Sequence, residues 1–137
     1  MSLAVLYSRA LSGMDAAQVT VEVHLANGLP SFTIVGLPEI EVKESKDRVR
    51  AALQNCQFEF PSRHITVNLA PADLPKESGR FDLPIALGIL AASGQIPADK
   101  LAEYEFAGEL ALTGELRAIR GALAMTYHAA NCGRAFI

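Results

Sequence analysis

One short segment in the middle of the sequence constrains the fold most, because it has the length of a helix and no polar side. Residues 85–92 read Ile-Ala-Leu-Gly-Ile-Leu-Ala-Ala. Pro84 suits a first helical turn, and Gly94 suits the left-handed residue that follows a last turn. A helix of about eleven residues is too short to cross a bilayer. The segment therefore predicts a central helix that is buried on all sides.

A polar loop over residues 71–82 precedes this helix. We expect Ser78, Gly79 and Asp82 to form a helix-capping loop, in which the Asp82 carboxylate accepts hydrogen bonds from free N–H groups of the first turn. Because helix N-termini attract anions and loops often carry functional residues, this loop is also a candidate ligand or catalytic site. The alternative is that its charged residues only cap the helix and face the solvent.

The overall composition is that of one folded domain without a strong charge field. The 137 residues are 50% hydrophobic and carry a net charge of −3, so a nucleic-acid contact would need a local basic patch. Cys56 and Cys132 form no CxxC pair, and the three histidines lie at no metal-ligand spacing. With no secretory signal pattern at the N-terminus, we expect reduced cysteines, no metal site, no membrane partner and a cytoplasmic protein.

Alternation of apolar and polar residues predicts the strands. It is clearest over residues 19–25 and 63–69, and residues 31–35 are also typical of a strand. We expect residues 19–25 and 31–35 to pair as a hairpin through the Asn27-Gly28 turn. Further expected elements are a strand at residues 2–8, a hairpin of residues 105–112 with 115–119, a helix at 121–131 and a strand that begins at 134. The expected fold class is α+β (mixed α/β), with helices packed mainly on one face of a sheet.

A helix is predicted over residues 39–56, with an apolar side and a charged side. Its cations are Lys43, Lys46, Arg48 and Arg50, and they alternate with acidic residues. A mixed charge run is usually a solvated helix face. The alternative is that these four cations contact phosphate groups.

Motif searches leave one nucleophile hypothesis. The sequence has no phosphate loop of the form GxxxxGK[ST], no GxGxxG and no HExxH. Ser78 lies two residues after Lys76, but a Ser/Lys dyad needs a desolvated, neutral amine. We expect Lys76 to lie in an exposed loop and to stay protonated and hydrated, which argues against catalysis.

Four segments carry a resemblance to a known family. They are SFTIVGLP (31–38), VKESKDRVRAA (42–52), ITVNLAPADLPK (65–76) and FDLPIALG (81–88). Together they resemble the N-terminal domain of the ComM/YifB family of bacterial magnesium-chelatase-like AAA+ proteins. The resemblance implies a single Lon-like domain over residues 1–137, similar to the Lon proteolytic domain and to ribosomal-protein domain-2-like sheets. It also implies that the domain is truncated on its C-terminal side, and that the AAA+ ATPase module is absent.

The resemblance implies a Lon-like scaffold without Lon chemistry. Matching the loop to the family that carries a serine nucleophile puts Arg80 at the serine position, and a later motif puts Leu123, or a neighbour, at the lysine position. No lysine follows Lys100 in the sequence, so one partner of the dyad is missing at any register. We therefore expect no catalytic residue in this chain.

The function implied is that of a non-catalytic module of a hexameric DNA branch-migration helicase in natural transformation. The module would serve DNA contact or ring assembly, and ATP and Mg²⁺ would belong to the AAA+ module. Two alternatives stay open: a Lon-like Ser/Lys peptidase that uses Ser78 in an atypical dyad, and a pure oligomerisation platform. The candidate DNA-binding residues are Lys43, Lys46, Arg48, Arg50, Lys76 and Arg80.

Overall fold

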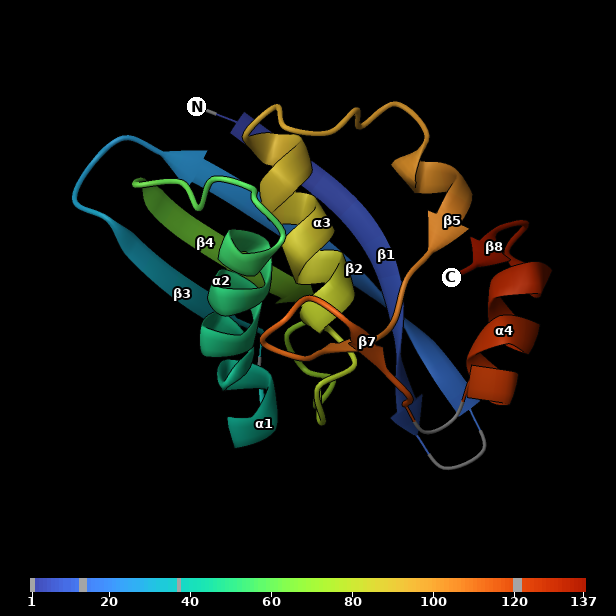
Figure 1. Cartoon of the computed structure of the whole chain (residues 1–137). Helices are drawn as coiled ribbons and strands as arrows, with labels where there is room; N and C mark the ends of the chain where they lie inside the picture. The colour runs from blue at the N-terminus through green and yellow to red at the C-terminus, as the bar shows by residue number, and fades with distance from the viewer. Residues whose placement is uncertain (1, 13–14, 37, 120–121) are drawn as a thin grey trace.

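A four-stranded sheet forms the centre of the computed structural model (Figure 1), which describes residues 2–12, 15–36, 38–119 and 122–137. The sheet has the strand order β1-β2-β4-β3. The bounds are β1 (Ser2–Ser12), β2 (Asp15–Ala26), β3 (Ser31–Val35) and β4 (His64–Ala70). The alternating patterns predicted at residues 19–25 and 63–69 are therefore confirmed as strands.

The pairing of these strands corrects the expected hairpin. β2 does not pair with β3, because β4 lies between them: β4 runs antiparallel to β2 and parallel to β3. The antiparallel hairpin is instead formed by β1 and β2. The physical reason is burial. Ile65, Val67 and Leu69 of β4 are at most 1% exposed, and a strand buried this deeply is typical of the interior of a sheet. In β3 every second side chain is exposed, which is typical of a strand at the edge.

The predicted central helix is present as α3 (Asp82–Ala92). Ile85 and Ile89 are fully buried, which confirms the prediction made from its lack of a polar side. The helix packs closely on the sheet: a Cβ atom built on Gly88 would lie 2.5 Å from Cγ2 of Val23 in β2. A small residue is therefore needed at this contact.

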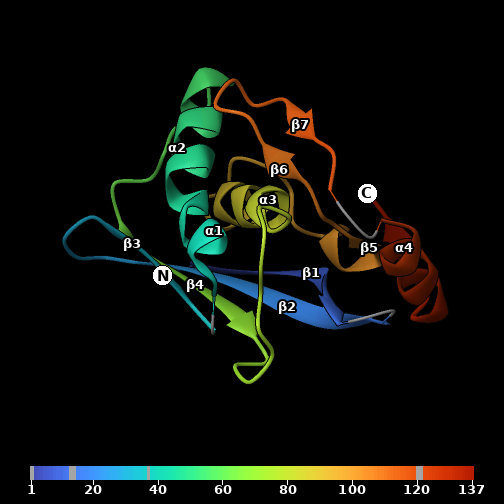
Figure 2. The ribbon, with the colours of Figure 1, turned by 90° about the horizontal axis from the view of Figure 1, so that it is seen from below.

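The helix predicted over residues 39–56 is two helices, α1 (Ile40–Lys43) and α2 (Ser45–Asn55), with Glu44 at the break. Val49 and Leu53 of α2 are buried, as the spacing predicts, whereas Cys56 is exposed. Viewed along the sheet, α1, α2 and α3 lie on the same face (Figure 2). The opposite face leaves Leu3, Val5 and Val35 exposed.

The remaining elements are short and follow η1 (Leu101–Glu103). They are β5 (Tyr104–Glu105), β6 (Glu109–Leu110), β7 (Leu116–Arg117), α4 (Ala122–Asn131) and β8 (Ala135–Phe136). The predicted hairpin exists as the antiparallel pair β6–β7, but its strands have two residues each, and β5 pairs in parallel with β8. Gly121, the expected helix start, lies outside the described residues. Among the described helices, none combines the length and the apolar character needed to cross a membrane.

Candidate functional site

The loop before α3 holds a buried amine where an exposed one was expected. Lys76 is 0% exposed. Its Nζ donates to the carbonyl oxygen of Gly36 at 2.6 Å and to that of Pro71. The loop folds back between the ends of β3 and β4, and the backbone N–H of Glu39 donates to the Lys76 carbonyl at 2.8 Å. The expectation of a hydrated lysine is wrong, because carbonyl oxygens replace water around the ammonium group.

Burial changes the acid–base behaviour of this amine. Desolvation lowers the pKa of Lys76 below its ordinary value, and the nearby Asp73 carboxylate offsets part of that shift. A lowered lysine pKa is one requirement of a Ser/Lys dyad. The second requirement is contact between this amine and the serine hydroxyl.

Ser78 has an arginine as its partner. Nε of Arg80 donates to the Ser78 hydroxyl at 3.0 Å, and Nη1 of Arg80 lies 3.4 Å from Sδ of Met125 in α4. Arg80 is 3% exposed, and desolvation lowers its pKa, with Glu77 opposing the shift. Ser78 itself adopts a φ of 66°, in the left-handed region. The hydroxyl of Ser78 and the amine of Lys76 therefore have different partners on different segments.

Asp82 does not cap α3 as expected. The cap position is occupied by Phe81, which makes no side-chain capping hydrogen bond. The Asp82 carboxylate is 0% exposed and accepts from Nε of Arg48 at 2.6 Å, from the Leu110 N–H at 3.0 Å and from the Ser45 hydroxyl. The prediction failed because α2 and β6 converge on the start of α3 and bring three donors to the carboxylate, of which the charged Arg48 guanidinium makes the strongest bond. The carboxylate in turn raises the pKa of Arg48.

A hollow of about 410 Å³ opens beside this loop. Its lining contains Ser78 and Gly79, two arginines, and three carboxylates. The charged members are Glu44, Glu77, Glu109, Arg48 and Arg80. Because carboxylates outnumber guanidinium groups and both arginines already bond to the protein, the hollow offers no clear anion site. Within the described ranges, no group of three or more His, Cys, Asp or Glu residues could hold a metal ion.

Comparison with known proteins gives the family. The family model for subunit ChlI of Mg-chelatase matches residues 21–137. The chain is 65% identical over 123 residues to competence protein ComM of Haemophilus influenzae. This match covers 90% of this chain and 24% of that protein. It is 56% identical over 137 residues to protein YifB of Escherichia coli, which covers 100% of this chain and 27% of that protein. The chain belongs to the magnesium-chelatase-like ComM/YifB family. It spans about a quarter of the length of these relatives.

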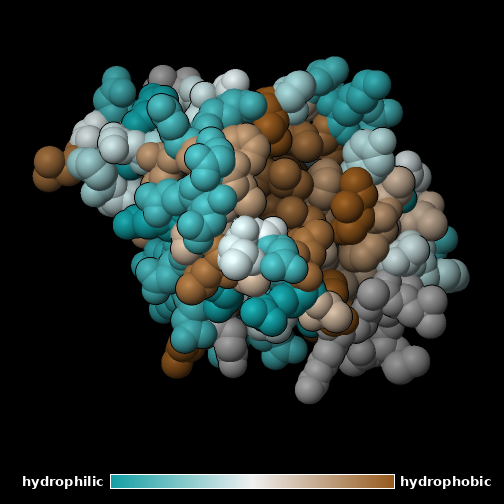
Figure 3. All heavy atoms as spheres, in the orientation of Figure 1, coloured by the Kyte–Doolittle hydropathy of each residue, from teal (hydrophilic) through white to brown (hydrophobic). Residues whose placement is uncertain are grey.

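Within this ComM/YifB chain, the six cations proposed to bind DNA divide into two groups. Arg48, Lys76 and Arg80 point inward and bond to the protein itself. Lys43 and Arg50 are exposed and Lys46 is half-buried on α1 and α2, where hydrophilic side chains cover the surface in Figure 3. Leu123, where the resemblance would place a lysine, lies in α4, and its side chain is outside the described part of the structure.

Sequence reasoning missed a second buried charge cluster. Nε of Arg9 in β1 lies 2.7 Å from Oε1 of Glu105 in β5, and Nη1 of Arg134 lies 3.1 Å from Oε2 of the same carboxylate. The guanidinium of Arg134 also stacks over the Tyr7 ring at 3.9 Å. Glu105 raises the pKa of Arg9. No short sequence signal indicates this cluster, because its members lie far apart in the chain.

Sequence reasoning also missed Arg63, which lines a second hollow together with Arg50. Arg63 is the first residue of the strand predicted over residues 63–69, and folding of the chain brings it to α2.

Proposed function

We propose that this chain is a non-catalytic, Lon-like N-terminal module of a magnesium-chelatase-like AAA+ ATPase, and that it contacts DNA in a ComM-like branch-migration helicase. In this proposal ATP and Mg²⁺ belong to the AAA+ module of the parent protein, which works as a cytoplasmic homo-hexamer. The observation that carries the proposal is the use of Lys76 and Ser78 inside the fold. Both groups that a peptidase would need already have partners.

The chemistry of those partners argues against a peptidase. A serine nucleophile needs a neighbouring base that can take its proton. The group that touches the Ser78 hydroxyl is the guanidinium of Arg80, which has no acceptor and stays protonated at any physiological pH. The Lys76 amine donates two hydrogen bonds to carbonyl oxygens, and its bonding role is structural.

The DNA contact is supported by the cations that remain on the outside. Lys46 and Arg50 lie four residues apart in α2, so they share one side of that helix, and Lys43 is exposed at the end of α1. No ion pair of these three residues is found within the described parts of the chain. Solvated cations of this kind attract a polyanion without a cost in folding energy.

The test is fluorescence anisotropy of labelled single-stranded and branched DNA against residues 1–137 at two salt concentrations. We expect binding that weakens as salt rises, because phosphate contacts release counterions. Replacing Lys43, Lys46 and Arg50 by glutamine should reduce it. Absence of binding at both salt concentrations would overturn the DNA contact and leave ring assembly as the role of the module.

The peptidase alternative has its own test. We expect no cleavage of an unfolded protein substrate by this chain. Cleavage that disappears in Ser78→Ala would contradict the non-catalytic assignment.

A further inference from the structure

A second hollow, of about 300 Å³, lies between α2, the start of β3 and the loop that leads into β4. We call it the Arg50–Arg63 pocket. The residues that matter for its chemistry are Ser31, Arg50, Gln54, Phe60, Ser62 and Arg63. Among its described lining residues none is acidic, in contrast to the hollow beside Ser78. The pocket therefore combines two guanidinium groups with hydroxyl and amide donors.

Arg50 stacks on one aromatic ring, which in turn packs on the core. Its guanidinium carbon lies 4.8 Å from the centre of the Phe60 ring, and Phe60 packs at 5.7 Å on Phe32, a core residue that is 9% exposed. Stacking on a ring uses the face of the guanidinium and leaves its in-plane N–H groups for other acceptors. The core thus presents a pre-oriented cation at the surface, which lowers the entropic cost of binding an anion.

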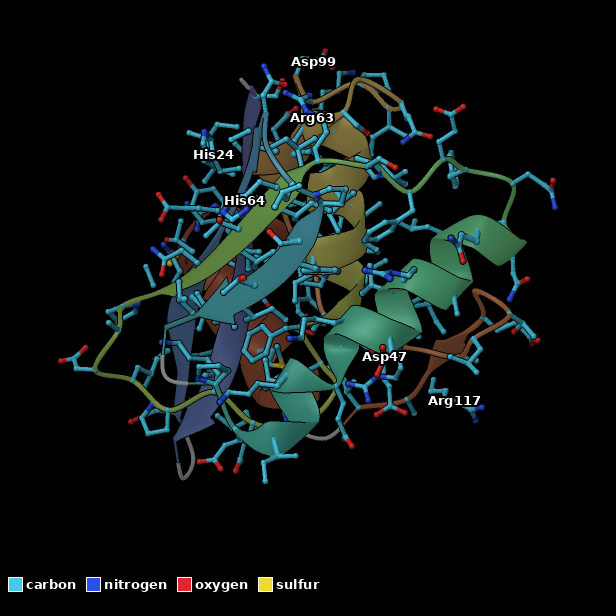
Figure 4. The ribbon with its side chains drawn as sticks, turned by 90° about the vertical axis from the view of Figure 1, so that its left-hand side faces the viewer. His24, Asp47, Arg63, His64, Asp99 and Arg117 are labelled. Atoms are coloured by element: carbon cyan, nitrogen blue, oxygen red, sulfur yellow. The ribbon has the colours of Figure 1, made fainter. Side chains whose placement is uncertain are left out.

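Arg63 forms the other side of the pocket. It is half-buried, and its carbonyl oxygen accepts from the Ser31 N–H at 3.2 Å, which fixes it beside the start of β3. The Ser31 hydroxyl lies 2.5 Å from Nδ1 of His64. Figure 4 shows Arg63 and His64 together at the beginning of β4, with Asp47 on α2 well apart from Arg63. In the part of the chain that the structure describes, no carboxylate lies within ion-pair distance of Arg50 or Arg63.

We propose that the Arg50–Arg63 pocket binds a phosphate group, and that this group is a backbone phosphate of a DNA strand. Two guanidinium groups can each take one non-bridging oxygen of a phosphodiester, and the hydroxyl of Ser62 adds a donor at the rim. The pocket lies beside β3, which is at one edge of the sheet. A single DNA strand can therefore pass along this edge and place a phosphate in the pocket. The identity of the strand rests on the proposed DNA contact, whereas the phosphate chemistry rests on the pocket alone.

The experiment compares two double variants with the same change of charge. Arg50→Gln with Arg63→Gln empties the pocket of its cations, and Lys100→Gln with Arg117→Gln removes two exposed cations that belong neither to the pocket nor to α1 and α2. Nuclear magnetic resonance titrations of residues 1–137 use a short thymidine oligonucleotide, inorganic phosphate, and a glutamate peptide of matched charge. The spectra also show whether each variant is folded.

We expect the oligonucleotide to shift the backbone amide signals of Ser31 and Ser62. The pocket variant should bind it about tenfold more weakly, with a salt dependence reduced by about 0.7 for each lost phosphate contact. The control variant should lose less than about threefold, because single exposed charges contribute little. Arg50→Lys, which keeps the charge but not the planar stacking group, should show an intermediate loss that a purely electrostatic role would not produce.

Each other outcome decides a different point. Equal losses in the two double variants would overturn the pocket and leave the DNA contact standing as diffuse attraction. Pocket shifts with inorganic phosphate but no oligonucleotide binding would support the phosphate site and overturn DNA as its source. Tighter binding of the glutamate peptide than of the oligonucleotide would overturn the phosphate assignment. No shift with any of the three probes would overturn both proposals.

Discussion

The basic residues of this chain fall into two regions that differ in what surrounds the charge. In the loop before α3, Lys76 and Arg80 are almost fully buried and bond to carbonyl, hydroxyl and sulfur atoms of the protein. On the outer side of α2, Arg50 is exposed and rests on an aromatic ring. The same residue types therefore have different roles. A buried cation fixes loops in place, and an exposed cation without a carboxylate partner is available to a ligand.

Arg48 marks the boundary between these regions. It precedes Arg50 by two residues, so the two side chains leave α2 in different directions, and Arg48 reaches the buried carboxylate of Asp82. A variant that removes this carboxylate is the most severe test of the buried charges that bond within the protein.

The largest expected effect is that of Asp82→Ala. The substitution removes the carboxylate that accepts from the Arg48 guanidinium, the Ser45 hydroxyl and the Leu110 N–H. Breaking such a pair should lower the free energy of unfolding by about 3 kcal/mol. Urea denaturation measures the change, with Asp47→Ala as the exposed control, expected within about 0.5 kcal/mol of the parent chain. Equal effects of the two variants would contradict the distinction between inward and outward charges.

The second effect is that of Lys76→Met, which keeps the apolar stem and removes the amine. Two carbonyl oxygens lose their donor, so we expect a loss of about 2 kcal/mol in the free energy of unfolding near neutral pH. Urea denaturation of the parent chain and of the variant provides the measurement.

The pH dependence of this loss has a definite sign. The pKa of Lys76 is lowered in the folded chain, whereas the unfolded chain keeps a value of about 10.4. Between these two pKa values the unfolded chain binds more protons, so the contribution of Lys76 to stability rises with pH through that window. Below the folded pKa both states are protonated, and the cost of burying the charge is fully present. The difference between parent and variant should therefore grow as pH rises, and a constant or shrinking difference would show that Lys76 is not desolvated.

The smallest effect on stability is expected from Lys43→Gln with Lys46→Gln. Neither cation has an ion pair among the described residues, so the free energy of unfolding should change by less than about 0.5 kcal/mol. DNA affinity should nonetheless fall slightly and its salt dependence should weaken. A loss of stability above that level, measured by urea denaturation, would place these lysines with the inward group.

Local patterns in the sequence predicted helices and strands, but they did not predict which strands pair. The apolar character of α3 and the alternation in β2 and β4 are properties of adjacent residues, and the structure confirms all three. The partner of β3 could not be predicted in this way. The strand is short, and its pairing with β4 depends on the burial of β4 in the folded sheet, which the sequence of β3 does not show. The Lon-like assignment of the sheet stays a prediction.

The candidate site shows the same limit. A loop rich in charges is usually hydrated, and nothing near Lys76 in the sequence indicates that the carbonyls of Gly36 and Pro71 enclose its amine. The partners of Asp82 come from α2 and β6. Arg63 and Arg50 line the same hollow, together with Phe60 and the start of β3. These contacts join distant segments, so tertiary packing decides them.

The strand order has a consequence for how the chain is made. β4 occupies a central place in the sheet, yet it is the last of the four strands to leave the ribosome. Until it emerges, β3 has no neighbour to receive its hydrogen bonds, and the apolar residues on the inner side of the β1–β2 hairpin remain uncovered. α3, which seals that side, follows later still. The nascent chain therefore passes through a stage with a half-built sheet open to water, and this is the interval in which association between chains competes with folding.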